Sequence, residues 1–245
     1  MPHFFINTSQ VNDCYIDIID PDTVLHLISS LRAKISDIIY VIDENQIRYT
    51  CKIIEINKKS LKLYVIKKEK SERMLNFQLD LAQGILNSDD QNVVIKKSTE
   101  LGVNDIYPIF TDNCSIKKSI IEKKISKWQK IALEASKQCE RAYIPNVKYI
   151  ENLFKLIDEN NYDKIIIFSE RENNLSLKSY LHKNKINKND KVLAIIGPEG
   201  GFSDNEFQLF NQRKLPQVSL GKLILRADTA VIVSISNLLY DVTDG

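Results

Sequence analysis

The chain has 245 residues, of which 43% are hydrophobic and 27% are charged, and its formal net charge is +2. This composition is typical of a globular protein, and the lack of a long apolar run argues against a membrane protein. The small net charge by itself gives no indication of a nucleic-acid partner.

The N-terminal sequence MPHFFINTSQVNDC has neither the charged start nor the continuous apolar stretch of a secretory signal, so we expect a cytoplasmic protein. The cysteines lie far apart and form no C-x-x-C pair, which argues against a zinc site or a redox motif. We therefore expect no metal. The cysteines are Cys14, Cys51, Cys114 and Cys139.

Lysines gather in three segments that contain few acidic residues, at 57–73, 115–130 and 178–191. Each segment by itself is typical of a solvated surface. Together they leave open a surface that faces the phosphates of a nucleic acid.

Residues 1–72 are predicted to form a small β-barrel. Short segments rich in Ile, Val and Tyr are separated by polar turns such as DENQ and NKKS, which indicates strands. One helix is predicted at 21–33, where Pro21 precedes apolar residues at helical spacing. The predicted strands are 3–6, 38–43, 47–56 and 61–68.

Residues 73–245 alternate between strand and helix patterns, which predicts an α/β fold with a mostly parallel sheet flanked by helices. The clearest helix is 120–142, whose apolar residues recur at three- and four-residue steps. Another helix is predicted to end just before Gly102, a residue type common after a helix. The predicted strands are 77–82, 105–110, 164–169, 191–197 and 217–221.

The stretch LAIIGPEGGFSDNEF holds three of the chain's 7 glycines. The apolar run Val192–Ile196 predicts a central strand, and Ser203 with Glu206 predicts a capping box for a helix that starts at Asp204. The loop Gly197–Gly201 therefore follows the carboxyl end of a central strand, which is where open α/β sheets bind ligands.

This loop matches neither G-x-x-x-x-G-K-[ST] nor G-x-G-x-x-G, and Glu199 would repel a triphosphate. On its own, the loop is equally typical of a turn that only connects a strand to a helix. A second loop contains Leu220–Gly221, and Asp228 or Thr229 is predicted to cap the final helix. Arg226 is either a surface salt-bridge residue or a group that orients an anion.

Four segments together resemble the RsmE family, which methylates N3 of a uridine in small-subunit (16S) ribosomal RNA with S-adenosylmethionine. They are KKSTELGVNDIYPIF, WQKIALEASKQCERAYIPNV, IGPEGGFSDNEF and SLGKLILRADTA. The N-terminal segments HFFI and HLISSLRAKISDIIYVID also resemble the PUA-like barrel of that family. The resemblance covers most of the chain.

The resemblance implies a PUA-like β-barrel at 1–72 that binds RNA, and a SPOUT-type methyltransferase domain at 73–245 with a trefoil knot near its C-terminus. It also implies a homodimer whose subunits complete the site together, with 16S rRNA in the small ribosomal subunit as the partner. Neither the knot nor the dimer follows from composition or periodicity.

The resemblance further implies an S-adenosylmethionine pocket at the ends of three strands. Uridine N3 must lose a proton as the methyl group arrives, so we expect Arg226 to stabilise the charge on the base and Glu199 to accept the proton or to position the base. The predicted cofactor-binding residues are Phe168, Ser169, Ile196, Gly197, Pro198, Gly200, Gly201, Leu220, Gly221, Leu225 and Thr229.

The sequence departs from the usual family pattern at three places. KQCER has Glu140 before Arg141 where the family has a glycine, DENQ stands for a DG-x-G turn, and NSDDQNVVI stands for a lysine-bearing segment. Arg141 and Glu100 are candidates for RNA-side or pocket-side residues, and both also fit structural ion pairs.

Two other functions remain open at this point. A non-catalytic RNA-binding protein would keep the fold, although both predicted cofactor loops are intact. A nucleotide-dependent α/β enzyme would use the glycine loop for phosphates, but the chain lacks the Lys-Ser/Thr pair that would hold them.

Overall fold

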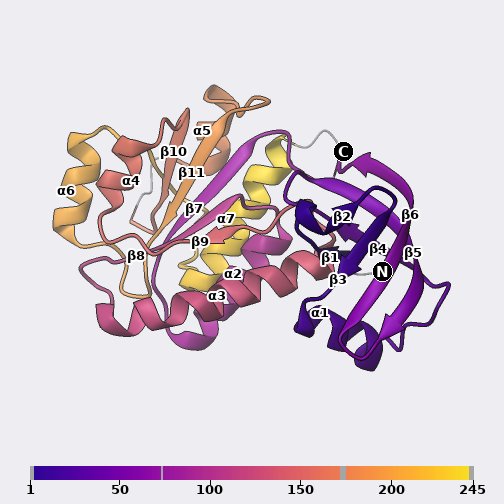
Figure 1. Cartoon of the computed structure of the whole chain (residues 1–245). Helices are drawn as coiled ribbons and strands as arrows, with labels where there is room; N and C mark the ends of the chain where they lie inside the picture. Colours follow the sequence, from indigo (N-terminus) through magenta and orange to yellow (C-terminus); the bar gives the residue numbers. More distant parts are fainter. Residues whose placement is uncertain (1–2, 73, 172–174, 243–245) are drawn as a thin grey trace. The chain divides into compact units, whose positions relative to one another are not determined.

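The computed structural model describes residues 3–72, 74–171 and 175–242, which fall into two compact units (Figure 1). The first unit contains the chain up to Met74 together with Ser136–Tyr143, and the second contains Leu75–Ala135 and the chain from Ile144 onward. The domain boundary expected after residue 72 adjoins residue 73, which lies outside the described residues.

The N-terminal unit is built on a six-stranded sheet in the order β1-β4-β5-β6-β3-β2. The pair β1–β4 is parallel and the other pairs are antiparallel. The strands are β1 (His3–Phe5), β2 (Val11–Asn12), β3 (Tyr15–Ile18), β4 (Ile38–Ile42), β5 (Ile47–Asn57) and β6 (Ser60–Lys70). Alternate residues point into one hydrophobic core, as Leu61 and Leu63 of β6 do.

All four strands predicted in this unit are confirmed, and β2 and β3 were missed. β2 is only 2 residues long and β3 only 4, so both are too short to stand out from the polar residues around them. The predicted helix starts at Pro21 as expected, because the Asp20 carboxylate caps it through the Thr23 amide at 2.8 Å. It forms α1 (Pro21–Leu25) and a π-helical turn, η2 (His26–Ser30); a short 3₁₀ turn, η1, covers Thr8–Gln10.

The second unit contains six strands that pair only in parallel, in the order β12-β10-β11-β7-β8-β9. They are β7 (Gln78–Gly84), β8 (Asp105–Ile109), β9 (Asn146–Val147), β10 (Lys164–Phe168), β11 (Lys191–Ile196) and β12 (Gln217–Val218). The prediction of a parallel sheet is confirmed. Because all strands run in the same direction, their carboxyl ends meet at one edge of the sheet.

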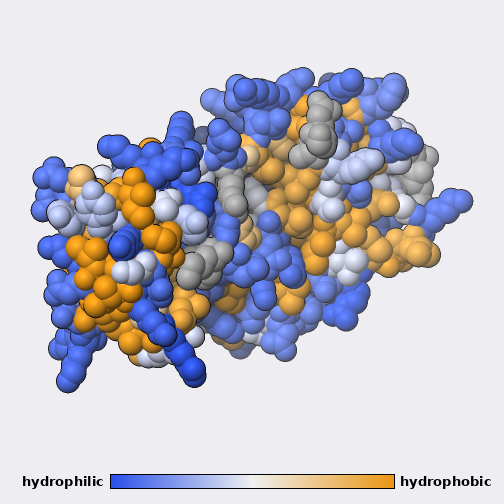
Figure 2. Space-filling view, turned by 90° about the vertical axis from the view of Figure 1, so that its right-hand side faces the viewer, coloured by the Kyte–Doolittle hydropathy of each residue, from blue (hydrophilic) through white to orange (hydrophobic). Residues whose placement is uncertain are grey.

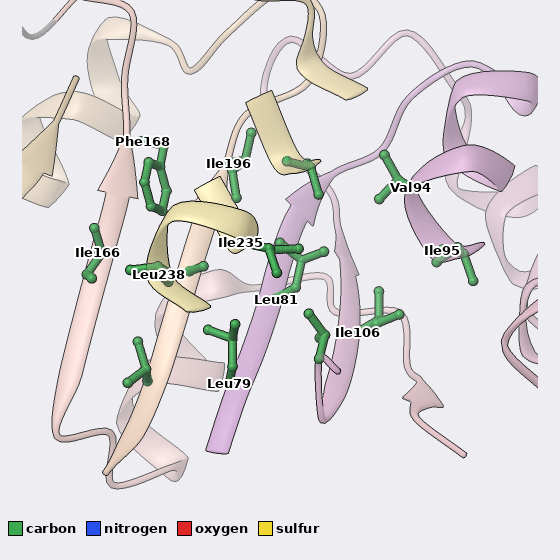
Figure 3. Packing of buried hydrophobic residues seen from close by; sticks show 14 of the residues in the cluster. Leu79, Leu81, Val94, Ile95, Ile106, Ile166, Phe168, Ile196, Ile235 and Leu238 are labelled. Carbon is green, nitrogen blue, oxygen red and sulfur yellow. The ribbon is translucent and has the colours of Figure 1, made fainter. Parts of the chain in front are cut away.

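Helices cover both faces of this sheet. Figure 3 shows one face, where Leu79 and Leu81 of β7 meet Ile235 and Leu238 of α7 and where Val94 of α2 packs nearby. The opposite face packs against α4 and α6. The helices are α2 (Ser88–Glu100), α3 (Lys118–Cys139), α4 (Leu153–Glu159), α5 (Leu177–Lys183), α6 (Asp204–Gln212) and α7 (Ala227–Val242).

The two-sided covering accounts for the continuous apolar run of β11. Every residue of Val192–Ile196 is buried, and successive residues belong alternately to the two hydrophobic cores. β11 lies between β10 and β7, so the prediction of a central strand is confirmed.

The ends of the helices agree with the sequence predictions in two cases and differ in one. The Ser203–Glu206 capping box starts α6 at Asp204, and Gly102 follows the end of α2 with φ +90°. The cap expected at Asp228 or Thr229 is wrong. The Ala230 amide donates to the Arg226 carbonyl at 2.8 Å, so α7 already begins at Ala227 and both residues lie in its first turn.

Large apolar side chains also reach the surface. Leu223, Ile224 and Tyr240 are 81%, 83% and 85% exposed. Figure 2 shows one face of the molecule, where hydrophobic side chains reach the surface in patches between hydrophilic ones. No helix within the described ranges combines the length and the apolar character needed to span a bilayer.

Glu140 occupies a backbone conformation that favours glycine. It follows the end of α3 with φ +57°, and its carboxylate lies 3.9 Å from His3 Nε2. A left-handed conformation costs a residue with a side chain about 1–2 kcal/mol. The geometry therefore explains why a glycine suits this position of the KQCER segment.

We expect Glu140→Gly to raise the free energy of unfolding by about 1 kcal/mol, because glycine adopts a positive φ without strain. Urea denaturation of the wild type and the variant measures this difference. Lys127→Gly, at an exposed position inside α3, is the matched control and is expected to lower stability by about 1 kcal/mol. A loss of stability in Glu140→Gly would contradict the assignment of strain to Glu140.

Candidate active site

A pocket of about 510 Å³ opens at the carboxyl ends of β10, β11 and β12. Its volume falls in the range of small-molecule sites, which is about 300–1,000 Å³. Its lining comes from four segments. Three are Leu86 with Asp90 near the start of α2, Phe168–Glu170, and Ile196–Gly201. The fourth runs from Ser219 into the first turn of α7 at Ala230, and within it only Lys222 and Thr229 do not line the pocket.

The glycine loop is held in a tight turn. Gly201 has φ +67°, and its amide donates to the Pro198 carbonyl at 2.9 Å. The Asn113 side-chain amide donates to the carbonyls of Gly200 and Gly201, each at 3.1 Å, from the loop after β8. These hydrogen bonds restrain the loop, whose inner side lines the pocket.

Gly84, the last residue of β7, lies directly against this loop. A Cβ at Gly84 would be 2.4 Å from the backbone nitrogen of Pro198 and 2.8 Å from the carbonyl carbon of Gly197. Since these are backbone atoms, no rotation of a side chain could relieve the clash. Gly84 therefore sets how closely the ends of β7 and β11 approach each other.

The second loop is fixed by its own side chain. Ser219 Oγ donates to the Gly221 carbonyl at 3.0 Å and accepts from the Gly221 amide at 3.1 Å, while Gly221 has φ +146°. Leu223 and Ile224, which follow, line the pocket although their side chains are largely exposed.

The chemical character of the pocket is apolar walls with an acidic rim. Phe168, Ile196, Leu220 and Leu225 supply apolar surface. The charged residues of the lining are four carboxylates and one guanidinium, namely Asp90, Glu170, Glu199, Asp228 and Arg226. This balance favours a cationic ligand over an anionic one such as a nucleotide triphosphate.

Hydrogen bonds connect the two predicted catalytic side chains to the start of α2. Glu199 Oε1 accepts from the backbone amide of Asn87 at 2.9 Å and from its side-chain amide at 3.2 Å. Arg226 Nη2 donates to Asp90 Oδ2 at 2.8 Å, and Arg226 Nε lies 3.6 Å from Asp228 Oδ1.

The structure brings together all but one of the residues predicted to bind the cofactor or to act in catalysis. Every predicted cofactor-binding residue lines the pocket except Thr229, which is exposed in the first turn of α7, and both Glu199 and Arg226 lie at the rim. Glu100 and Arg141 do not line it. Glu100 pairs with Lys97 at 2.7 Å, and the buried Arg141 guanidinium lies 4.3 Å from the centre of the Tyr143 ring.

Sequence reasoning missed Gly84, Asn87 and Asp90. The available signal was Gly84 itself, two residues after the predicted strand 77–82, since a glycine at a strand end permits close backbone approach. Asn87 and Asp90 follow it within the NSDDQNVVI segment. Within the described residues, no cluster of three or more His, Cys, Asp or Glu side chains could hold a metal ion.

Comparisons with known proteins identify the family. A profile of the RNA methyltransferase domain matches residues 73–239, and a profile of the RNA methyltransferase PUA domain matches residues 19–66. The chain is 35% identical over 211 residues to ribosomal RNA small subunit methyltransferase E of Buchnera aphidicola subsp. Acyrthosiphon pisum, an alignment that covers 85% of this chain and 81% of that one. The chain belongs to the ribosomal RNA small subunit methyltransferase E family.

Other members of the family and a solved structure agree over the full length. The Mesomycoplasma hyopneumoniae methyltransferase E is 30% identical, with 98% of this chain and 100% of that one covered. A Legionella pneumophila protein solved in complex with the bound cofactor SAM is 26% identical with a TM-score of 0.84, covering 97% of this chain and 96% of that one. The family assignment makes this chain an RNA methyltransferase and confirms the resemblance found in its sequence.

We expect Gly84→Ala to lower the free energy of unfolding by about 1–3 kcal/mol, because the new methyl group would push the Pro198 backbone away from β7. Thermal unfolding followed by circular dichroism measures the change. Gly197→Ala is the matched control, since its Cβ would be 3.3 Å from the Phe202 ring, a side chain that is able to shift. Equal stability of Gly84→Ala and the wild type would contradict a close backbone contact.

Proposed function

We propose that the protein transfers a methyl group from S-adenosylmethionine to N3 of a uridine in 16S rRNA within the small ribosomal subunit. The observation that carries this proposal is the pocket at three adjacent strand ends, with apolar walls and an acidic rim, in a chain of the methyltransferase E family. The SAM bound by the Legionella pneumophila relative supports the same cofactor here.

The lining of the pocket fits this cofactor. Apolar side chains such as Phe168, Leu220 and Leu225 suit the faces of an adenine ring, and the glycine loop leaves room for close contact with backbone amides. Carboxylates at the rim attract a donor that carries a sulfonium and an ammonium group. When bound, S-adenosylmethionine supplies a methyl group that its sulfonium already activates.

The protein must still hold uracil N3 in line with the methyl–sulfur bond of the cofactor and accept the N3 proton. Glu199 is the proposed acceptor of the N3 proton, since its carboxylate lies at the rim of the pocket. Loss of this proton spreads negative charge towards O2 and O4 of the base. The Arg226 guanidinium is the proposed group that stabilises that charge.

We also propose a domain arrangement and an assembly. Residues 1–72 form a PUA-like barrel that binds RNA, and residues 73–245 form a SPOUT-type catalytic domain with a trefoil knot and Thr229 at its cofactor site. The profile match at 19–66 supports an RNA-binding role for the N-terminal unit. The exposed Leu223, Ile224 and Tyr240 support a homodimer that covers them, and the substrate indicates a cytoplasmic enzyme.

The test is transfer of labelled methyl from S-adenosylmethionine to small ribosomal subunits that lack uridine methylation, followed by mass spectrometry of the digested nucleosides. We expect label in N3-methyluridine. Label in another nucleoside would overturn the assignment of N3. Binding of the cofactor without transfer to subunits or to free rRNA would favour a non-catalytic RNA-binding protein.

We expect Arg226→Ala to lower kcat about 100-fold with little change in the dissociation constant of S-adenosylmethionine, because Arg226 acts on charge that develops only in the base. Single-turnover assays and calorimetry measure the two quantities. Arg171→Ala is the matched control, since Arg171 is exposed and paired with Asp204 at 2.6 Å but lies outside the pocket lining. A kcat for Arg226→Ala equal to that of the control would remove Arg226 from the mechanism.

A further inference from the structure

We infer that Asn87 and Asp90, at the start of α2, are positioning residues that hold Glu199 and Arg226 in their working geometry. The inference rests on the proposed function of these two side chains. It adds residues that neither the sequence motifs nor the family resemblance assigned to the site.

The contacts form one continuous chain along the rim of the pocket. Glu199 Oε1 accepts from both amides of Asn87, the Asn87 side-chain amide also donates to Asp90 Oδ2 at 2.8 Å, and Arg226 Nη2 donates to the same Asp90 oxygen at 2.8 Å. Two side chains from one helix start therefore link the proposed proton acceptor to the proposed charge-stabilising group.

Helix capping fixes the direction of the Asn87 side chain. Asn87 Oδ1 accepts from the backbone amides of Asp89 and Asp90, each at 3.2 Å, as the N-cap of α2. The carboxamide oxygen must therefore face the helix, and the NH₂ group must face Glu199 and Asp90. The capping bonds therefore hold the Asn87 NH₂ group in a fixed direction, from which it donates to the Glu199 carboxylate.

Each held side chain keeps one reactive atom available. The contacts to Asn87 use Glu199 Oε1, and Oε2 accepts no hydrogen bond from the described residues. The contacts of Arg226 use Nη2 and Nε, and Nη1 donates to no acceptor in the part of the chain that the structure describes. Oε2 is therefore open to take the N3 proton, and Nη1 is open to donate to a carbonyl oxygen of the base.

The difference in burial indicates that Asp90 restrains Arg226, rather than the reverse. The Asp90 side chain is 20% exposed, whereas that of Arg226 is 74% exposed. A long exposed guanidinium samples many rotamers unless it is held. Without a restraint, the entropic cost of fixing its position would add to the activation free energy of the reaction. Asp90 supplies this restraint before the substrate arrives.

The decisive experiment is a double-mutant cycle on kcat with Asp90→Asn, Arg226→Ala and the combined variant. We expect Asp90→Asn to lower kcat about tenfold with the KM for S-adenosylmethionine unchanged, and to have no further effect when Arg226 is already alanine. Asp90→Glu is expected to restore part of the activity. Asp89→Asn is the matched control, because it removes the same charge from the exposed neighbour in the same turn.

A second cycle pairs Asn87→Ser with Glu199→Gln. Serine caps a helix about as well as asparagine, so Asn87→Ser keeps α2 intact and removes the side-chain amide that donates to both Glu199 and Asp90. We expect a loss of kcat in the wild-type background and a smaller loss in Glu199→Gln, where only the contact of Asn87 with Asp90 remains to be removed. Equal thermal unfolding of all variants confirms that the fold is unchanged.

A readout independent of activity comes from NMR of labelled arginine. In the unliganded wild type, we expect a restrained Arg226 guanidinium, assigned by its absence in Arg226→Ala, and faster rotation about Cζ–Nε in Asp90→Asn. Additive effects in the cycles, or unchanged rotation in Asp90→Asn, would overturn the positioning role while the methyltransferase assignment stands. An inactive wild type that binds cofactor would instead overturn the proposed function itself.

Discussion

The close approach of two strand ends determines the geometry of the site. β7 and β11 are adjacent and parallel, and Gly84 at the end of β7 lies against the backbone of Gly197 and Pro198 at the end of β11. Only a residue without a side chain allows this contact. Asn87 follows Gly84 by three positions, so the same contact also fixes where α2 begins relative to Glu199. One backbone contact therefore sets both the wall of the pocket and the hydrogen bonds along its rim.

The charged side chains of the rim favour a cationic ligand. A glycine loop at a strand end commonly serves phosphates, but here the loop carries Glu199 and the neighbouring lining adds Asp90, Glu170 and Asp228. Arg226, the one cation among the described residues of the lining, is close to two of these carboxylates. Such a pocket favours a positively charged donor, and it keeps its guanidinium directed by anions that belong to the protein.

Local sequence signals predicted the parts of the site that depend on neighbouring residues. The apolar run of β11, the Ser203–Glu206 capping box and the two loops were predicted because periodicity and capping act over a few residues. The rim network was not predictable in this way. Asn87 and Glu199 are 112 positions apart, and Asp90 and Arg226 are 136 apart. Such pairs follow only from strand order, which periodicity does not determine.

The start of α7 was predicted wrongly because Arg226, a residue type not favoured for capping, precedes its first turn.

The exposure of the rim also indicates when its interactions become strong. Arg226 is held from one side by Asp90 and is open to solvent on the other, where water weakens its interaction with any anion. An RNA substrate that covers the rim would exclude this water. The attraction between Nη1 and the developing charge on the base would then rise at the moment of transfer, because the surrounding dielectric constant falls. The side chain would need no new restraint for that step, since the carboxylate at the start of α2 already supplies it.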